Sequence, residues 1–265
     1  TGAVPDIFSL RRLDLFSYNE FLSFTHKPAG EQAVNEFLSR GAFPGLIKTG
    51  HTEALHQLYT EILCKDAVIA GGIRDRNTLQ RMALHLITNT GEPVTANKLR
   101  EKLKIKAVST AAEHMQCIET AGLVRFVSIL SDNPARQAVN PRKVYAVDTA
   151  LAAAVSTAET VDRNKLFETM LFNHLCRESR SVCYTNEQGG CDFIASDAEG
   201  GVRCIQACYD DDPDLMQTKT DGLLWALRQT GASRGTIVTA DRNDRIDAEN
   251  FEIEVIDADT FLGGY

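Results

Sequence analysis

The stretch Val182–Tyr209, VCYTNEQGGCDFIASDAEGGVRCIQACY, decides the fold expected for the C-terminal part of the chain. It contains three short strand candidates, Val182–Thr185, Cys191–Ser196 and Val202–Tyr209, and each connecting turn ends in a pair of Gly residues. Gly at such turns supplies the positive φ that tight hairpins require. The stretch therefore predicts three consecutive strands, and apolar helical patterns on both sides predict a mixed sheet covered by helices.

Two polar residues, Asp192 and Gln206, lie inside these otherwise apolar strands. A carboxylate in a strand is destabilising unless it is paired or binds a cation. The period of two places Cys204, Gln206 and Cys208 on one face of the last strand. The helix expected before the strands carries Glu168 among apolar neighbours. A Glu on a helix, an Asp on a strand and a Gln on the next strand have the outline of a metal-dependent nuclease core.

Glu168, Cys191–Phe193 and Ile205–Tyr209 resemble the restriction-endonuclease-like, PD-(D/E)xK type of domain. More narrowly, they are similar to the C-terminal domain of unknown function attached to a large group of prokaryotic AAA-type ATPases. In the nuclease pattern an Asp and a Glu or Gln hold a divalent metal, and a Lys two residues further on orients the attacking water.

The resemblance implies Asp192 and Gln206 as the metal ligands, if any metal binds, and places Cys208 where the Lys belongs. Without that fixed cation, water activation and stabilisation of the phosphate charge are weakened. We therefore expect a silent site in which Glu168, Asp192, Gln206 and Cys208 are relics, and no catalytic residue.

The N-terminal part is similar to the small helical lid of the same ATPases, on the stretches Arg12–Leu22, Gly41–Pro44 and Lys65–Asp66. The sequence has no G-x-x-x-x-G-K-[ST], so it contains no P-loop to hold phosphates on backbone amides. The resemblance implies that ATP and Mg²⁺ bind in a domain upstream of this chain. We expect no cofactor here, except a divalent metal if the nuclease-like site works.

The middle of the chain predicts a winged helix-turn-helix, because three helical patterns precede two strands. The stretch Asn140–Thr149 also resembles the Pro-Arg-Lys signature of the ATPase family. The expected helices are 78–89, 95–103 and 109–121, and the expected strands are 123–130 and 143–148. The fold class is thus multidomain α and α/β, with a lid at 1–72, a winged helix at 73–149 and a PD-(D/E)xK-like domain at 150–265.

Charge is unevenly distributed along the chain. The net charge is −8 overall, but it is −2 for residues 1–69, +6 for 70–145 and −12 for 146–265. Basic residues flank the second helix and the wing, where they are candidates for phosphate contacts: Lys98, Arg100, Lys102, Arg136, Arg142 and Lys143. The third helix argues against base reading, because its outward candidates Ser109, Glu113, Gln116 and Glu119 include two acids.

Three functional classes remain open from the sequence. The first is a non-catalytic region of an AAA-type ATPase that grips DNA or a protein partner. The second is an active metal-dependent DNA nuclease, and the third is a pure protein-interaction module. No long uncharged apolar run or basic-then-apolar leader occurs, which predicts a cytoplasmic protein without a membrane partner. The seven Cys are expected to be free thiols.

Overall fold

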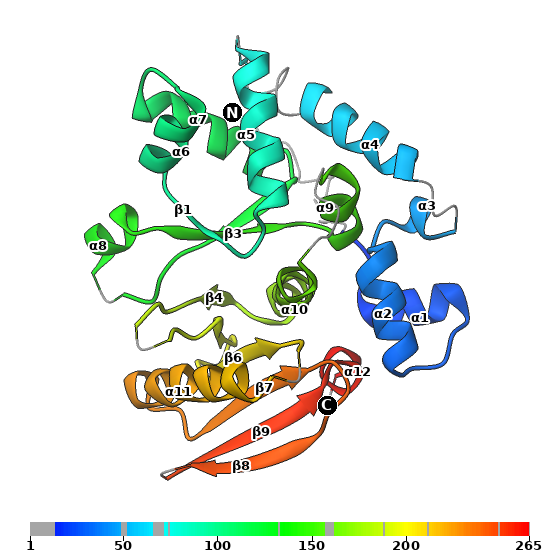
Figure 1. The fold of residues 1–265 in the computed structure, drawn as a ribbon, viewed down its shortest axis with the longest axis vertical. Coiled ribbons are helices and arrows are strands. Elements are labelled where there is room, and N and C mark those ends of the chain that lie inside the picture. The colour runs from blue at the N-terminus through cyan, green and yellow to red at the C-terminus, as the bar shows by residue number, and fades with distance from the viewer. Residues whose placement is uncertain are drawn as a thin grey trace, which may run out of the picture.

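The computed structural model describes residues 14–48, 52–65, 72–73, 75–131, 133–156, 162–187, 189–210, 212–248 and 250–264, without the side chains of residues 134, 136 and 138. These residues form N-terminal helices, a part built on a three-stranded sheet and a part built on a six-stranded sheet (Figure 1). We call the last two the three-stranded part (75–146) and the six-stranded part (163–264). The structure thus confirms a mixed α/β architecture.

The N-terminal helices begin at a capping box that the sequence indicates. The Ser17 side chain accepts from the Glu20 N–H, and the Glu20 carboxylate accepts from the Ser17 N–H, so two of the unpaired donors at the helix start are satisfied. The helices are α1 (Tyr18–Thr25), α2 (Glu31–Arg40), α3 (Pro44–Ile47) and α4 (Thr52–Glu61).

The three-stranded part alternates helices with short strands. Its elements are α5 (Arg76–Thr88), β1 (Pro93–Val94), α6 (Ala96–Leu103), α7 (Val108–Thr120), β2 (Val124–Val127), α8 (Pro134–Val139) and β3 (Arg142–Ala146). The strands are antiparallel in the order β1-β3-β2. Thr95 caps α6 through the Lys98 N–H, as its sequence position predicts. The turn expected between the last two strands instead contains α8, which begins at Pro134, a residue suited to a first helical turn.

The six-stranded part holds the stretch Val182–Tyr209. Its elements are α10 (Arg163–Glu178), β4 (Ser181–Cys183), β5 (Phe193–Ser196), β6 (Val202–Cys208), α11 (Pro213–Thr230), β7 (Arg234–Thr239), β8 (Asp244–Ala248), β9 (Phe251–Asp257) and α12 (Ala258–Gly263). The strand order is β4-β5-β6-β7-β9-β8, with the β6–β7 and β7–β9 pairs parallel and the others antiparallel. α11 covers the face that carries Cys204 and Cys208, and α10 packs on the other.

The parts are joined through one continuous core and through specific hydrogen bonds. α9 (Thr149–Val155) packs on α2, α4 and α5. The backbone beyond β2 extends to the six-stranded part, where Tyr184 N donates to Ser128 O at 3.2 Å and Leu130 N donates to Tyr184 O at 2.7 Å. At the other end, the Asp259 carboxylate of α12 accepts from the Tyr18 hydroxyl at 2.5 Å. Each part therefore contacts both of the others.

Candidate functional site

The structure brings Glu168, Asp192 and Gln206 together, as the sequence pattern predicts. Glu168 lies on α10, Asp192 directly precedes β5, and Gln206 lies in β6. Because β5 and β6 are antiparallel with Phe193 opposite Ile205, Asp192 and Gln206 are neighbours. The Asp192 N–H donates to Gln206 Oε1 at 3.0 Å. The polar residues of the two strands thus form one connected site.

An ammonium from the three-stranded part closes this site. The Nζ atom of Lys143, on β3, lies 2.8 Å from Glu168 Oε1 and 3.1 Å from Asp192 Oδ1. Two residues further along the same face of β3, the Tyr145 hydroxyl donates to Glu168 Oε1 at 2.6 Å. The side chains of Lys143 and Asp192 are 14% and 9% exposed. A residue expected to touch nucleic acid therefore faces inward and pairs with the carboxylates.

A second ammonium reaches the site from α11. Lys219 Nζ lies 2.5 Å from Asp192 Oδ2, which also accepts from the Ala207 N–H at 3.1 Å. Burial disfavours the ionised form of Asp192, but the ammoniums of Lys219 and Lys143 hold the pKa of this carboxyl well below its usual value. The same contacts hold the pKa of both lysines above the ordinary value, against the effect of burial. Two carboxylates and two ammoniums therefore balance one another.

Sequence reasoning missed Lys219, although a signal is present. Lys219 is four residues from both Leu215 and Leu223, so it lies within the apolar stripe of α11. A Lys at such a position predicts an internal carboxylate partner, because an unpaired buried charge is strongly destabilising. The identity of that partner, Asp192, depends on the register between α11 and the sheet, which no local pattern specifies.

Gln206 is held by the backbone around it. Its side chain is fully buried, and its amide Nε2 donates to Gly190 O at 2.8 Å and to Lys219 O at 3.0 Å, while its Oε1 accepts from Asp192 N. All polar atoms of the carboxamide thus have protein partners, and their orientation is fixed by one donor and two acceptors. Gln206 ties β6 to α11 and to the segment between β4 and β5.

The residues present do not fit the divalent metal that the nuclease resemblance implies. The oxygen of Gln206 is directed at a backbone N–H, and both carboxylates already contact ammoniums. Burial raises the pKa of the Cys208 thiol, so a neutral group stands where the nuclease pattern has Lys. Over the described ranges, no group of three or more His, Cys, Asp or Glu side chains is arranged to hold a metal ion. None of the seven cysteines, all of which lie in the described ranges, forms a disulfide.

The other residues predicted to contact nucleic acid differ in exposure and in their partners. Lys98 and Lys102 are exposed on α6, whereas Arg100 is half-buried and pairs with Glu101 at 3.0 Å. The Arg142 guanidinium lies 4.5 Å from the centre of the Phe126 ring, and the side chain of Arg136 is outside the described part. His114 of α7 is buried, with 3% of its surface exposed.

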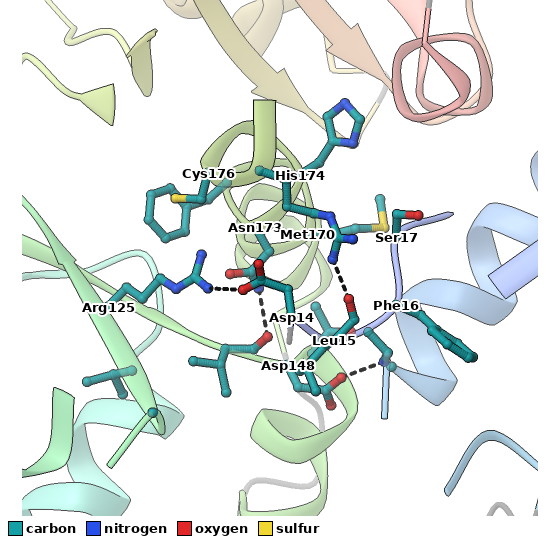
Figure 2. Close-up of a pocket in the computed structure, with 18 of the residues that line it drawn as sticks. Asp14, Leu15, Phe16, Ser17, Arg125, Asp148, Met170, Asn173, His174 and Cys176 are labelled. Atoms are coloured by element: carbon teal, nitrogen blue, oxygen red, sulfur yellow. Dashed lines mark hydrogen bonds and ion pairs between the residues drawn. The ribbon is translucent and has the colours of Figure 1, made fainter. Parts of the chain in front are cut away.

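A separate cavity of about 660 Å³ lies where the three parts meet. Figure 2 shows Arg125 of β2 pointing across it toward Asp14, to which it pairs at 3.4 Å, and Asn173 of α10 on the adjoining wall. Arg177 of α10 donates to the Leu15 carbonyl oxygen in the same segment. These contacts hold the chain before α1 against α10 and β2, so the cavity edge is part of the packing between parts.

The comparison with protein families finds a match between residues 31–162 and a family described as Domain of unknown function (DUF8612). The match runs from α2 to the residue before α10 and spans just under half of the chain. No curated protein and no solved structure matches the chain. In the structure, no described helix has the length and apolar character needed to cross a membrane.

Proposed function

We propose that this chain is the non-catalytic C-terminal region of an AAA-type ATPase, with a winged helix fastened to a degenerate nuclease-like domain. The observation that carries the proposal is the position of Lys143, whose ammonium lies between Glu168 and Asp192. An ammonium held there pairs with both carboxylates and occupies the space between them, and Lys219 supplies the second positive charge. A cytoplasmic location and an upstream ATP-binding domain belong to the same proposal.

The element order supports a winged helix. Three helices, α5, α6 and α7, alternate with β1 and precede the β2–β3 pair, and β3 lies between β1 and β2 in the sheet. In a DNA-binding winged helix, α7 would enter the major groove and the β2–β3 connection would contact the backbone. Here β3 directs Lys143 and Tyr145 toward the six-stranded part instead, which favours a structural role for this sheet.

The absence of nuclease activity is tested with the purified chain, Mg²⁺ or Mn²⁺, and supercoiled DNA. We expect no nicking above the level given by the Asp192→Asn variant, because the carboxylates are held by lysines. Nicking by the wild-type chain that disappears in Asp192→Asn would overturn the proposal.

A metal-dependent phosphodiesterase is the second candidate, and Lys219 is the observation that favours it. Its ammonium contacts Asp192 and lies near the buried Cys208 thiol, so α11 supplies a cation that β6 lacks. If this candidate is correct, Lys219→Met abolishes nicking while leaving the thermal unfolding midpoint close to that of Asp192→Asn. The nicking assay on these two variants therefore separates the two functions.

Nucleic-acid backbone binding is the interaction that we propose for the three-stranded part, through exposed lysines of α6 and the loop after it. These are Lys98, Lys102, Lys104 and Lys106. Fluorescence anisotropy with duplex DNA across a salt series tests this, because each phosphate contact adds about one to the salt dependence of log affinity. Lys98→Ala with Lys102→Ala is expected to lower the slope by about two.

Arg142→Ala provides the matched control, since its guanidinium stacks on Phe126. We expect it to leave the slope unchanged. Wild-type binding that is absent or insensitive to salt would favour the remaining class, a module that binds protein partners only.

A further inference from the structure

The lysine between Glu168 and Asp192 comes from a different part of the fold than the carboxylates. β3 carries Lys143, whereas its partners lie on α10 and directly before β5. We propose that Lys143 is an internal counter-ion that takes the place of a divalent cation in this site, so that cation entry and attachment of the three-stranded part exclude one another. The inference rests on the proposed function, in which the carboxylate pair is the relic of a metal site.

The charge balance supports this exclusion. Glu168 and Asp192 carry two negative charges, and Lys143 and Lys219 carry two positive ones, so the site as folded is neutral. A divalent cation at contact distance from an ammonium is repelled strongly in a partly buried site. The divalent cation gains a favourable position between the two carboxylates only when Lys143 is absent or withdrawn. One oxygen of each carboxylate then no longer contacts the Lys143 ammonium.

The position of Lys143 depends on the attachment of β3. Tyr145, on the same face of β3, donates to Glu168, and its ring stacks on Phe172 with centres 4.2 Å apart. The Tyr184 ring lies 5.6 Å from Lys143 Nζ, and the Tyr184 hydroxyl donates to Pro141 O at 2.6 Å. The Lys143 ammonium therefore leaves the site only if the residue is substituted or if the two sheets separate. Its position between the carboxylates thus depends on the attachment of the two sheets.

Terbium luminescence gives a readout that does not depend on activity. Tb³⁺ is a hard cation that binds oxygen ligands in the manner of Ca²⁺, and nearby Tyr145 and Tyr184 sensitise its emission. Lys143→Met removes the ammonium and keeps much of the side-chain volume. We expect sensitised emission at a given Tb³⁺ concentration to be at least about tenfold higher in Lys143→Met than in the wild type. Excess Mn²⁺ should compete for this emission.

Two variants give the controls. Adding Asp192→Asn to Lys143→Met should return the emission to the wild-type level. Lys165→Met should stay at that level, because Lys165 also joins the two parts, through Glu92, but does not contact the carboxylate pair. If circular dichroism shows that Lys143→Met does not fold, Lys143→Gln is used, which removes the charge and keeps a hydrogen-bond donor.

Emission in the Lys143 variant no higher than wild type, or emission that persists in the Asp192→Asn double variant, would overturn the inference. Nicking of DNA by the wild-type chain would instead overturn the proposed function. The two failures are therefore distinguishable.

Discussion

At the scale of single residues, Gln206 separates a structural site from a metal site. A Glu would be the better ligand for a cation, so Gln206→Glu would improve a working metal centre. In the structure the change directs a carboxylate oxygen at the carbonyl oxygens of Gly190 and Lys219, where Nε2 now donates. We expect Gln206→Glu to lower the free energy of unfolding by about 3 kcal/mol.

Urea unfolding measures this change, and Gln229→Glu is the control because Gln229 is exposed, on α11. Its stability should differ from wild type by less than about 0.5 kcal/mol. A Gln206→Glu variant as stable as this control, or one stabilised by Mn²⁺, would count against the structural role.

Asp192 gives a second residue-scale prediction, which concerns pH. The pKa of Asp192 is lower in the folded chain than in the unfolded chain, chiefly because the Lys219 and Lys143 ammoniums outweigh burial. Its carboxylate therefore stabilises the fold above the unfolded pKa of about 3.9, and this contribution is lost as pH falls from there toward the folded pKa.

Asp192→Asn leaves the two lysines without one partner and should lower stability by about 3–5 kcal/mol at neutral pH. The difference between the variant and the wild type should shrink as pH falls below about 4. Urea unfolding over a pH series checks this. A difference that is constant with pH would show that the charge of Asp192 does not stabilise the fold.

At the scale of elements, the close approach of α11 to the segment between β4 and β5 depends on a residue without a side chain. A Cβ at Gly222 would lie 2.0 Å from Gly190 O and 3.0 Å from Gln206 Nε2. Because Gly190 O belongs to the backbone and accepts a hydrogen bond from Gln206 Nε2, α11 must shift to accept a methyl group. We expect Gly222→Ala to lower the free energy of unfolding by about 1–3 kcal/mol.

Gly263→Ala is the matched control, because a Cβ there meets nothing within 4 Å. Thermal unfolding of both variants tests the prediction. Equal midpoints for the two variants would mean that α11 is free to move away from the segment between β4 and β5.

The local sequence predicted the helices and strands well, but it predicted the candidate site only in part. Ser17 with Glu20, and Thr95, predicted helix starts because capping is set within a few residues. The sequence did not predict β8, because Asp244 and Asp247 give this segment the polarity of a loop. β8 is an edge strand of the sheet, where charged side chains are common.

The inward direction of Lys143 was also missed. Its sequence neighbours, Arg142 and Val144, do not specify that this face of β3 meets the six-stranded part. The nuclease resemblance placed Asp192 and Gln206 in one site, and they are neighbours in the structure, whereas Lys143 and Lys219 come from elements whose placement depends on tertiary packing.

At the scale of the whole molecule, the shared core predicts a single unfolding event. One cluster of buried apolar side chains includes Phe21 of α1, Leu86 of α5 and Phe193 of β5. Trp225, the single Trp, packs against the second cluster under α11. We expect the fluorescence of Trp225 and the far-ultraviolet circular dichroism of the chain to change with the same midpoint on heating. The reason is that the three-stranded part and the six-stranded part share a core, which neither keeps when the other unfolds.

Two separated transitions would show that the parts fold independently. Comparison with Lys143→Met shows how much of the coupling comes from the lysine. A gap between the two midpoints that opens only in that variant would assign the coupling to the ammonium rather than to the apolar core.

The contacts through α12, Tyr184 and β3 that link the three parts of the chain have a mechanical consequence. Tension applied between the N-terminal helices and the six-stranded part is shared by the Asp259–Tyr18 hydrogen bond and by the path through α9 and the three-stranded part. Two routes loaded in parallel resist extension better than one, so an external pull would turn the chain as a stiff body rather than stretch it.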